Sequence, residues 1–470
     1  MPSTTPSHAG TGPKIKVGEV HSLRVEDLAP NGRGLAYLSG QPIFVKEAVP
    51  GDVVQVQLVR VRPNQTEAKI LKIETASPNR ISPRCQHFGP CGGCDLQQVA
   101  YPAQVEWKLK ALKEVLQREG GFKALPPIQV WPMKDPWAYR SKMEFSFGQE
   151  ADRVTLGLHQ RGSFHRIVDI ATCHIAPPAV SELLTAIKQV ANRFSLQSYN
   201  PKFHQGFWRY AVIRSSGHRQ ELLLLLVTNE GPREPIDALL TELPAAVPAL
   251  KSFYWGISTK VSDVAQPERM ALVFGSETLE DAIGQIRFQM RPTNFVQPNR
   301  LLVPTIYEAI QNAVALTGRE VVYDLYCGIG LIALSLAGQA KAVYGVESEE
   351  ENVTSAQRNA DLNGITNATF LCGKVEDLLR GRALFKAGPK PDVIVVDPPR
   401  VGLHKEVYAP LLEAQSPAVV YLSCNPLSMA KDLKILLERD PRYQLTDMQM
   451  FDFFPHTTHV EVLATLRRQS

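Results

Sequence analysis

Cys424 lies in a sequence context that can support covalent chemistry. It follows the apolar stretch 418–422, which predicts a buried strand, and it precedes Asn-Pro at 425–426, where a helix can begin. A thiolate is a strong nucleophile, but a free cysteine is only a few per cent ionised at neutral pH. The N-terminus of the following helix would lower the pKa of this thiol. These features predict that Cys424 is a nucleophile.

A glycine-rich turn at 326–330 predicts a cofactor site. It follows the apolar strand 320–325 and leads into the apolar helix 331–337, the order of strand, loop and helix that nucleotide-type cofactors require. The next strand ends in Glu347, 23 residues after Asp324, and this carboxylate can accept hydrogen bonds from two ribose hydroxyls. The pattern predicts the first βαβ unit of a doubly wound sheet.

The same turn leaves two alternatives open. Gly328, Gly330 and Ala333 also fit the glycine pattern of an NAD-type Rossmann domain. Cys327 is a competing nucleophile, although it belongs to the cofactor loop, whereas Cys372 falls in a predicted buried strand and is interpreted as structural.

A second motif distinguishes between the two cofactor classes. The predicted strand 393–396 ends in Asp-Pro-Pro-Arg at 397–400. This motif resembles that of base-modifying methyltransferases, in which the rigid turn lines the pocket between the methyl donor and a flat substrate. It therefore favours a methyl donor over a nicotinamide cofactor.

Polar residues ahead of the last predicted strand supply candidates for a catalytic base. They lie in or beside the segment 453–461 and are Glu461, His456, His459 and Asp452. A cysteine nucleophile and a carboxylate base beside a methyl-donor site match the methylation of a pyrimidine carbon particularly well.

Another cysteine group predicts a metal site. Cys85, Cys91 and Cys94 form a Cys-x5-Cys-x2-Cys cluster with adjacent glycines, and three thiolates of a structural site require a fourth ligand. Cys173 is the remaining cysteine outside the C-terminal third, and His87 is an alternative ligand. Sulfur ligands select zinc or an iron–sulfur cluster, and spacing alone does not decide between them.

Composition predicts a soluble chain of several domains. The 470 residues are 44% hydrophobic and 21% charged, which excludes general disorder, and the longest apolar run, 222–227, is far too short to span a membrane. Residues 1–13 lack the features of a secretory signal and are expected to form a flexible tail. Cysteines in a chain of this kind indicate metal binding or catalysis in the cytoplasm.

The N-terminal segment predicts a small β-barrel that binds nucleic acid. Residues 14–84 hold 11 Lys and Arg against seven Asp and Glu, which accounts for the whole net charge of +4. Val54, Val56 and Leu58 alternate with polar residues, and turn sequences stand at 30–32 and 50–52. The segment 15–74 resembles the TRAM domain, an OB-like RNA-binding barrel.

The central part predicts a helix followed by strands. Apolar residues recur at helical spacing over 101–121, and strand-like stretches recur from Tyr139 to about Phe288, which predicts a mainly antiparallel middle domain. Basic and aromatic residues mix at 139–142 and 159–161, a pattern compatible with RNA contact and equally with an ordinary surface.

Taken in order, the motifs resemble those of the RNA uracil-5-methyltransferase family. The glycine turn, Asp-Pro-Pro-Arg, Ser-Cys-Asn-Pro and Phe-Pro-His-Thr-x-His-x-Glu occur in the family's order, and the TRAM-like segment and cysteine cluster extend the resemblance to members that modify ribosomal RNA. The resemblance implies that S-adenosylmethionine is the methyl donor, that Cys424 forms a covalent adduct with C6 of uracil, and that Glu461 is the proton acceptor.

The resemblance also implies the residues that bind cofactors. A [4Fe-4S] cluster would be held by Cys85, Cys91, Cys94 and Cys173, and S-adenosylmethionine would be contacted by Gln297, Tyr326, Glu347 and Asp397. Two residues depart from the family pattern: Pro298 follows the glutamine, and Leu331 stands where some members carry a polar cofactor contact.

We therefore expect an α/β protein that acts on RNA as a cytoplasmic monomer. The expected domains are a tail at 1–13, a TRAM barrel at 14–75, a middle domain with the cluster at 76–290, and a Rossmann-like methyltransferase domain at 291–470. The expected substrate is 23S ribosomal RNA, with transfer RNA as the alternative. The rival classes are an NAD- or iron–sulfur-dependent oxidoreductase and an RNA-binding protein without catalytic activity.

Overall fold

The computed structural model describes the chain in two compact units. It describes residues 15–62, 65–261, 264–380, 384 and 388–469, so the expected tail at 1–13 lies outside the described residues. The first unit comprises the chain up to Gly89 together with Cys94–Trp107 and His456–Thr458, and the second comprises Pro90–Gly93, Lys108–Pro455 and His459–Ser470.

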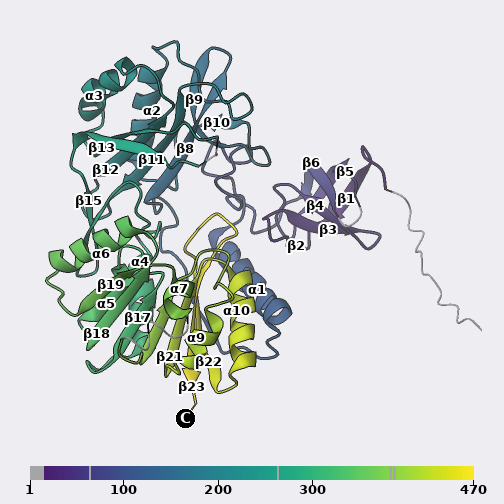
Figure 1. Cartoon of the computed structure of the whole chain (residues 1–470). Coiled ribbons are helices and arrows are strands. Elements are labelled where there is room, and N and C mark those ends of the chain that lie inside the picture. Colours follow the sequence, from purple (N-terminus) through teal and green to yellow (C-terminus); the bar gives the residue numbers. More distant parts are fainter. Residues whose placement is uncertain (1–14, 63–64, 262–263, 381–383, 385–387, 470) are drawn as a thin grey trace, which may run out of the picture. The chain divides into compact units, whose positions relative to one another are not determined.

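The N-terminal segment forms a six-stranded sheet (Figure 1). Its order is β1-β5-β6-β4-β3-β2, and only β4 and β6 pair in parallel. The expected alternation is confirmed, because Val54, Val56 and Leu58 are buried in one core. The strands are β1 (Val20–Arg24), β2 (Asp27–Leu28), β3 (Gly34–Leu38), β4 (Gln41–Val45), β5 (Val53–Arg60) and β6 (Thr66–Thr75).

A buried ion pair ties this sheet to the chain that follows it. Asp52 is fully buried, and its carboxylate lies 2.5 Å from Nη2 of Arg80. The same carboxylate accepts hydrogen bonds from the backbone N–H groups of Val49 and Ser77. Burial by itself raises the pKa of Asp52, but these hydrogen bonds and the Arg80 charge more than offset that effect and lower it.

The middle part contains a mainly antiparallel sheet of seven strands, as expected. Its order is β10-β9-β8-β11-β12-β13-β14, and only β12 and β13 pair in parallel, across a connection through α3. The elements are β8 (Lys142–Glu150), β9 (Arg153–His159), β10 (Ile167–Asp169), α2 (Pro178–Ala191), β11 (Trp208–Ser215), β12 (Leu222–Thr228), α3 (Glu234–Ala246), β13 (Leu250–Ile257) and β14 (Arg269–Gly275).

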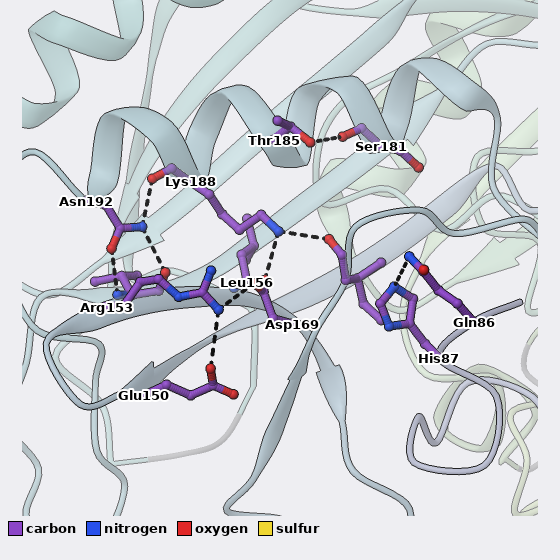
Figure 2. Close-up of polar contacts among 12 residues, drawn as sticks. Gln86, His87, Glu150, Arg153, Leu156, Asp169, Ser181, Thr185, Lys188 and Asn192 are labelled. Carbon is purple, nitrogen blue, oxygen red and sulfur yellow. Dashed lines mark hydrogen bonds and ion pairs between the residues drawn. The ribbon is translucent and has the colours of Figure 1, made fainter.

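Helix α2 is fastened to the edge of this sheet by polar contacts (Figure 2). Lys188 of the helix donates to Oδ1 of Asp169 at 2.8 Å, and Asn192 bonds with the backbone N–H and carbonyl of Val154. Arg153 reaches both Glu150 and Asp169. These contacts hold the helix against β9 and β10. The loop between β10 and α2 is therefore flanked by two elements that are bonded to each other.

The C-terminal part is a doubly wound sheet of eight strands, in agreement with the expected α/β fold (Figure 1). Its order is β19-β18-β17-β20-β21-β23-β22-β7, and only β23 runs antiparallel to its neighbours. The strands are β7 (Ile128–Trp131), β17 (Val321–Leu325), β18 (Ala342–Glu347), β19 (Ala368–Cys372), β20 (Val393–Val396), β21 (Ala418–Ser423), β22 (Tyr443–Phe451) and β23 (Glu461–Arg468).

Several helices and a hairpin accompany this sheet. Helices α5 and α10 follow β17 and β21 directly, so their N-termini lie at the carboxyl edge of the sheet. The elements are α1 (Tyr101–Gly120), α4 (Val303–Val314), α5 (Leu331–Ala337), α6 (Glu350–Leu362), α7 (Val375–Leu379), α9 (Tyr408–Glu413), α10 (Pro426–Arg439), and the hairpin of β15 (Leu279–Ile283) and β16 (Ile286–Met290).

Two features of this part differ from the sequence-based picture. Strand β7 lies within the range 76–290 of the expected middle domain, but it pairs with β22 and so belongs to the C-terminal sheet. Cys372 was expected to be buried, yet it is exposed, because it is the last residue of β19, where the chain leaves the sheet at Gly373. None of the helices in the described ranges is long and apolar enough to cross a membrane.

Candidate functional site

A cavity of about 530 Å³ opens at the carboxyl edge of the C-terminal sheet. The strand order places β17 between β18 and β20, which makes this edge the switch point where open α/β sheets bind ligands. The cavity is lined by 295–298, Tyr307, 326–329, 331–332, 347–348, 397–400, Cys424, Phe454 and Glu461. It therefore brings together all six residues of the C-terminal domain that the sequence resemblance singled out.

The glycine turn between β17 and α5 forms one wall of the cavity. Its backbone adopts left-handed conformations, with φ values of 68° at Tyr326, 54° at Gly328 and 82° at Gly330. A Cβ at Gly330 would come within 2.8 Å of the Phe370 ring, so only glycine fits there. The carboxylate of Glu347 accepts a hydrogen bond of 3.0 Å from the backbone N–H of Gly328, which holds the turn against the end of β18.

A second wall is formed by the turn after β20. Nε2 of Gln297 donates to Oδ2 of Asp397 at 3.0 Å, so these two residues, 100 positions apart in sequence, form one polar unit. Burial raises the pKa of Asp397 to about 7, although the Gln297 hydrogen bond opposes this shift. Burial also raises the pKa of Asp324, the acid of β17, to about 8. A buried carboxyl group that lines the cavity, as Asp397 does, favours a cationic ligand, which would stabilise its ionised form.

Cys424 lies beside this wall, between β21 and α10. Burial raises the pKa of its thiol, and the nearby Glu461 carboxyl adds to the shift, while a hydrogen bond and the charge of Arg400 oppose it. The sequence predicts that the N-terminus of α10 lowers this pKa, but the net shift is upward, because burial and Glu461 outweigh the effects that lower it. The first turn of α10 is capped by Asn425, whose side chain accepts a hydrogen bond from the backbone N–H of Leu427.

Glu461 is the first residue of β23 and lines the same cavity. Glu461 is only 1% exposed. Within the described part of the chain, neither oxygen of its carboxyl group has a hydrogen-bond partner. Burial raises its pKa well above the usual value, with a further contribution from Asp397. A buried carboxyl group without partners costs free energy of folding, so its presence beside Cys424 indicates a functional role.

The other base candidates have different surroundings. Asp452 forms an ion pair of 2.5 Å with Lys108, and both side chains are fully buried. Lys108 also donates to the carbonyl of Phe454 at 3.0 Å, so the pair positions a segment that lines the cavity. His456 belongs to the first compact unit, where its Nδ1 lies 3.2 Å from Nε2 of Gln104, and His459 is exposed.

Cys327 is less suited than Cys424 to act as the nucleophile. It also lines the cavity, but burial and the carboxyl groups of Asp324 and Glu347 raise its pKa well above the usual value, and no cation is among the causes of its shift. Cys424, in contrast, has Arg400 as a cationic partner. The geometry therefore favours Cys424.

The two departures from the family pattern also lie in the cavity wall. The carbonyl of Pro298 accepts hydrogen bonds from the backbone N–H and the hydroxyl of Ser141, at 2.7 and 3.0 Å. Gln297 lines the cavity even though a proline follows it. Leu331 contributes an apolar surface. Sequence reasoning missed the role of Arg400, although its motif had been recognised, because a motif does not show which side chain it will contact.

The four cysteines of the expected iron–sulfur site fall in both compact units. Cys85 and Cys94 belong to the first unit, and Cys91 and Cys173 belong to the second, where both are buried. Over the described residues, the structure contains no group of three or more His, Cys, Asp or Glu side chains arranged to hold a metal ion. A [4Fe-4S] cluster is therefore not shown.

The local structure around Cys91 fits a thiolate-bound group. The backbone N–H of Gly93 donates to Sγ of Cys91 at 3.4 Å, and a Cβ at Gly92 would come within 2.9 Å of the His159 carbonyl oxygen. Tight backbone turns with N–H groups directed at sulfur are typical of cysteines that ligate metal.

Comparison with known families gives two matches along this chain. The family model described as tRNA (uracil-5-)-methyltransferase matches residues 100–469, and the TRAM domain model matches residues 14–71. An RNA methyltransferase from Bacillus cereus is 34% identical, with 97% of this chain and 98% of the relative covered. One from Nitratidesulfovibrio vulgaris is 35% identical, with 96% of each chain covered.

A solved structure is also similar over nearly the whole chain. The tRNA (uracil-54, C5)-methyltransferase of Pyrococcus abyssi, in complex with S-adenosyl-L-homocysteine, superimposes with a TM-score of 0.75 and 28% sequence identity. The match covers 95% of this chain and 99% of that protein.

Proposed function

Because the chain belongs to the tRNA (uracil-5-)-methyltransferase family, we propose that it converts a uridine of RNA to 5-methyluridine through a covalent adduct at Cys424. The observation that supports this proposal most strongly is that Cys424 and Glu461 line one cavity with the expected cofactor residues. When bound, S-adenosylmethionine supplies an electrophilic methyl group. The residues proposed to hold it are Gln297, Tyr326, Glu347 and Asp397. The carboxylates of Glu347 and Asp397 suit its positive charge.

The first chemical step is addition of the Cys424 thiolate to C6 of the uracil. The new S–C6 bond forms while the electrons of the C5–C6 double bond move toward O4, which makes C5 an enolate carbon. C5 of free uracil is a poor nucleophile, so this covalent step divides one difficult reaction into two easier ones. The enolate carbon would then take the methyl group of S-adenosylmethionine, and the electron pair of the broken S–CH3 bond would stay on sulfur, so that S-adenosylhomocysteine leaves.

The second step is removal of the C5 proton by Glu461. Its carboxylate takes the proton, the C5–C6 double bond forms again, and the thiolate of Cys424 leaves. The burial that raises the pKa of Glu461 makes its ionised form a stronger base than an exposed carboxylate. The absence of hydrogen-bond partners on this side chain in the described structure leaves both oxygens available to the substrate.

Arg400 has the role of stabilising the thiolate. A guanidinium that donates a hydrogen bond to sulfur favours the ionised thiol, both in the free enzyme and when the thiolate leaves in the last step. Phe454 lines the same cavity and provides an aromatic surface on which an unstacked uracil can stack. The Lys108–Asp452 pair holds the backbone of Phe454 in place.

We propose ribosomal RNA, and 23S ribosomal RNA in particular, as the substrate. The support is the sequence resemblance, since a TRAM domain and four cysteines together resemble the members that modify ribosomal RNA. The similarity to the tRNA (uracil-54, C5)-methyltransferase of Pyrococcus abyssi supports the alternative, transfer RNA. Mapping 5-methyluridine in both RNA fractions from a strain without this gene decides between them, and loss of the modification from neither fraction would contradict the proposed function.

We also propose that Cys85, Cys91, Cys94 and Cys173 hold a [4Fe-4S] cluster with a structural or RNA-positioning role. The support is the family resemblance and the backbone turn at Cys91, where the N–H of Gly93 donates to the cysteine sulfur. Protein purified without oxygen is expected to contain about four irons per chain, as this cluster type requires. One zinc per chain would contradict the assignment, and Cys173→Ala is expected to lose the iron but still bind S-adenosylmethionine.

A further inference from the structure

A second cavity, of about 380 Å³, lies in the middle domain and is lined by none of the residues of the catalytic cavity. It is formed at the surface of strands β8, β9 and β11, which are neighbours at one end of the seven-stranded sheet (Figure 1). We call it the β8–β11 pocket. It is lined by 146–149, His159, 164–165, Ile167, 199–202 and 209–210. A volume of this size lies in the range of small-ligand pockets.

The segments that border this pocket expose large aromatic side chains. Phe164 lines the pocket and is 79% exposed, and Phe203, which directly follows the lining segment 199–202, is 63% exposed. Each of these side chains would be more stable buried by roughly 1.5–3 kcal/mol, so their exposure at one place needs a reason. Exposed apolar side chains that gather beside a pocket mark a binding surface.

Another aromatic side chain of the pocket is held in a fixed position. The ring of Tyr199 has the Arg209 guanidinium 4.0 Å from its centroid. Arg209 is itself only 2% exposed and donates to the carbonyl of Ser258 at 2.8 Å and to Asn229 at 3.2 Å. The cation covers one face of the tyrosine ring, so a planar ligand can stack on the other face without reorganisation of the wall.

The charged side chains of the pocket indicate which kind of planar ligand it can bind. Lys202 and Arg209 are among the lining residues, and Nζ of Lys202 lies 5.4 Å from the centroid of the Phe203 ring. The described lining residues include no Asp or Glu. Aromatic rings interleaved with cations and without carboxylates form a surface that takes bases by stacking and phosphates by charge.

We propose that the β8–β11 pocket binds one unpaired nucleotide of the RNA substrate, separate from the uridine that is methylated. The inference rests on the proposed function, since it names how the same substrate is recognised. Phe164 and Tyr199 would stack on the base, and Lys202 would contact the adjoining phosphate. A uridine can enter the catalytic cavity only from an unpaired segment, so neighbouring unpaired nucleotides are available to such a pocket.

The proposal is tested by direct crosslinking of the full-length protein to the oligonucleotide dodecauridylate with ultraviolet light. Mass spectrometry is expected to find crosslinked nucleotide on peptides that contain Phe164 or Tyr199, besides crosslinks in the TRAM and catalytic domains. Crosslinks confined to the TRAM and catalytic domains would overturn the proposal. Binding of a protein at this pocket, in place of the oligonucleotide, would overturn it as well.

Variants give a second and quantitative test. Phe164→Ala removes an exposed ring, so folding is retained, and it is expected to weaken dodecauridylate binding at least about fivefold, the lower limit for loss of one base–aromatic stack. Phe164→Trp is expected to restore binding, because it restores a stacking surface. Leu272→Ala is the matched control, since Leu272 is an exposed apolar residue of β14 at the opposite edge of the same sheet.

The readouts separate failure of this inference from failure of the proposed function. With an unmethylated RNA that the protein methylates, Phe164→Ala is expected to raise KM and to leave kcat at saturating RNA unchanged. Equal KM values for Phe164→Ala, Leu272→Ala and the unmodified protein would overturn the inference while the methyl transfer itself stands. If the unmodified protein transfers no methyl group to RNA, the proposed function fails, and the crosslinking result then decides alone whether the pocket binds RNA.

Discussion

Replacement of Arg400 by glutamine is expected to shift the ionisation of Cys424 to higher pH. Arg400 donates a hydrogen bond to this thiol and contributes an attractive charge, and both effects lower the pKa that burial and Glu461 raise. Glutamine keeps a hydrogen-bond donor of similar length but has no charge. The backbone carbonyl of residue 400, which accepts a hydrogen bond of 2.7 Å from Asn425, is retained in the variant.

The size of the shift follows from the environment of Arg400. Because glutamine keeps a donor, the change is mainly the loss of the guanidinium charge, and the charge of a side chain as exposed as Arg400 contributes about 0.2–1 kcal/mol. At a fixed pH below the pKa, the thiolate fraction is then expected to fall by up to about fivefold in the variant.

The measurement is the rate at which iodoacetamide alkylates Cys424 as a function of pH, followed by mass spectrometry of the peptide that contains it. Only the thiolate reacts, so the rate rises tenfold per pH unit below the pKa and levels off above it. The peptide readout excludes signal from the exposed Cys372. Arg400→Lys, which keeps the charge without the guanidinium fork, is expected to give an intermediate curve, and identical curves for Arg400→Gln and the unmodified protein would refute this reasoning.

Three further changes have expected outcomes. Glu461→Gln is expected to attack and methylate uracil but to accumulate protein joined to labelled RNA on a denaturing gel, whereas normal turnover would assign the base to another group. Lys108→Met leaves Asp452 buried without its cation, so it is expected to lower the free energy of unfolding by about 3–5 kcal/mol in denaturant titrations. The double variant Lys108→Met/Asp452→Leu is expected to recover much of this loss. Unchanged stability of Lys108→Met would contradict the role given to the ion pair. Deletion of residues 1–74 is expected to raise the RNA KM more than it lowers kcat and to reduce the salt dependence of RNA binding, and unchanged RNA affinity would argue against the basic TRAM domain as an RNA binder.

The sequence predicts that several of the candidate site residues meet at one edge of the C-terminal sheet. Glu347, Asp397 and Cys424 each end or directly follow a strand with a clear apolar pattern, and parallel strands of a doubly wound sheet end at the same edge. The motif order therefore predicts that Glu347, Asp397 and Cys424 lie together, and the cavity contains them with Gln297, Tyr326 and Glu461.

The ionisation of these residues could not be predicted in the same way. The pKa of Cys424 depends on Arg400, which lies on another loop, and on Glu461, which begins the antiparallel strand β23. A rule about helix N-termini takes only the local chain into account, and here burial outweighs that effect. The sequence did not predict that β7 belongs to the C-terminal sheet, for a similar reason. Its pairing with β22 joins segments about 320 residues apart, and a pattern in the local sequence cannot predict such a contact.

Covalent trapping at Cys424 is the most direct test of the proposed mechanism. Transcripts of 23S ribosomal RNA and of transfer RNA that contain 5-fluorouridine cannot lose a proton from C5, so methyl transfer should leave the protein joined to the RNA. Mass spectrometry is expected to find methylated 5-fluorouracil bound through C6 to Cys424, and Cys424→Ala is expected to form no such product. An adduct at Cys327, or methylation of unsubstituted RNA by Cys424→Ala, would contradict the mechanism.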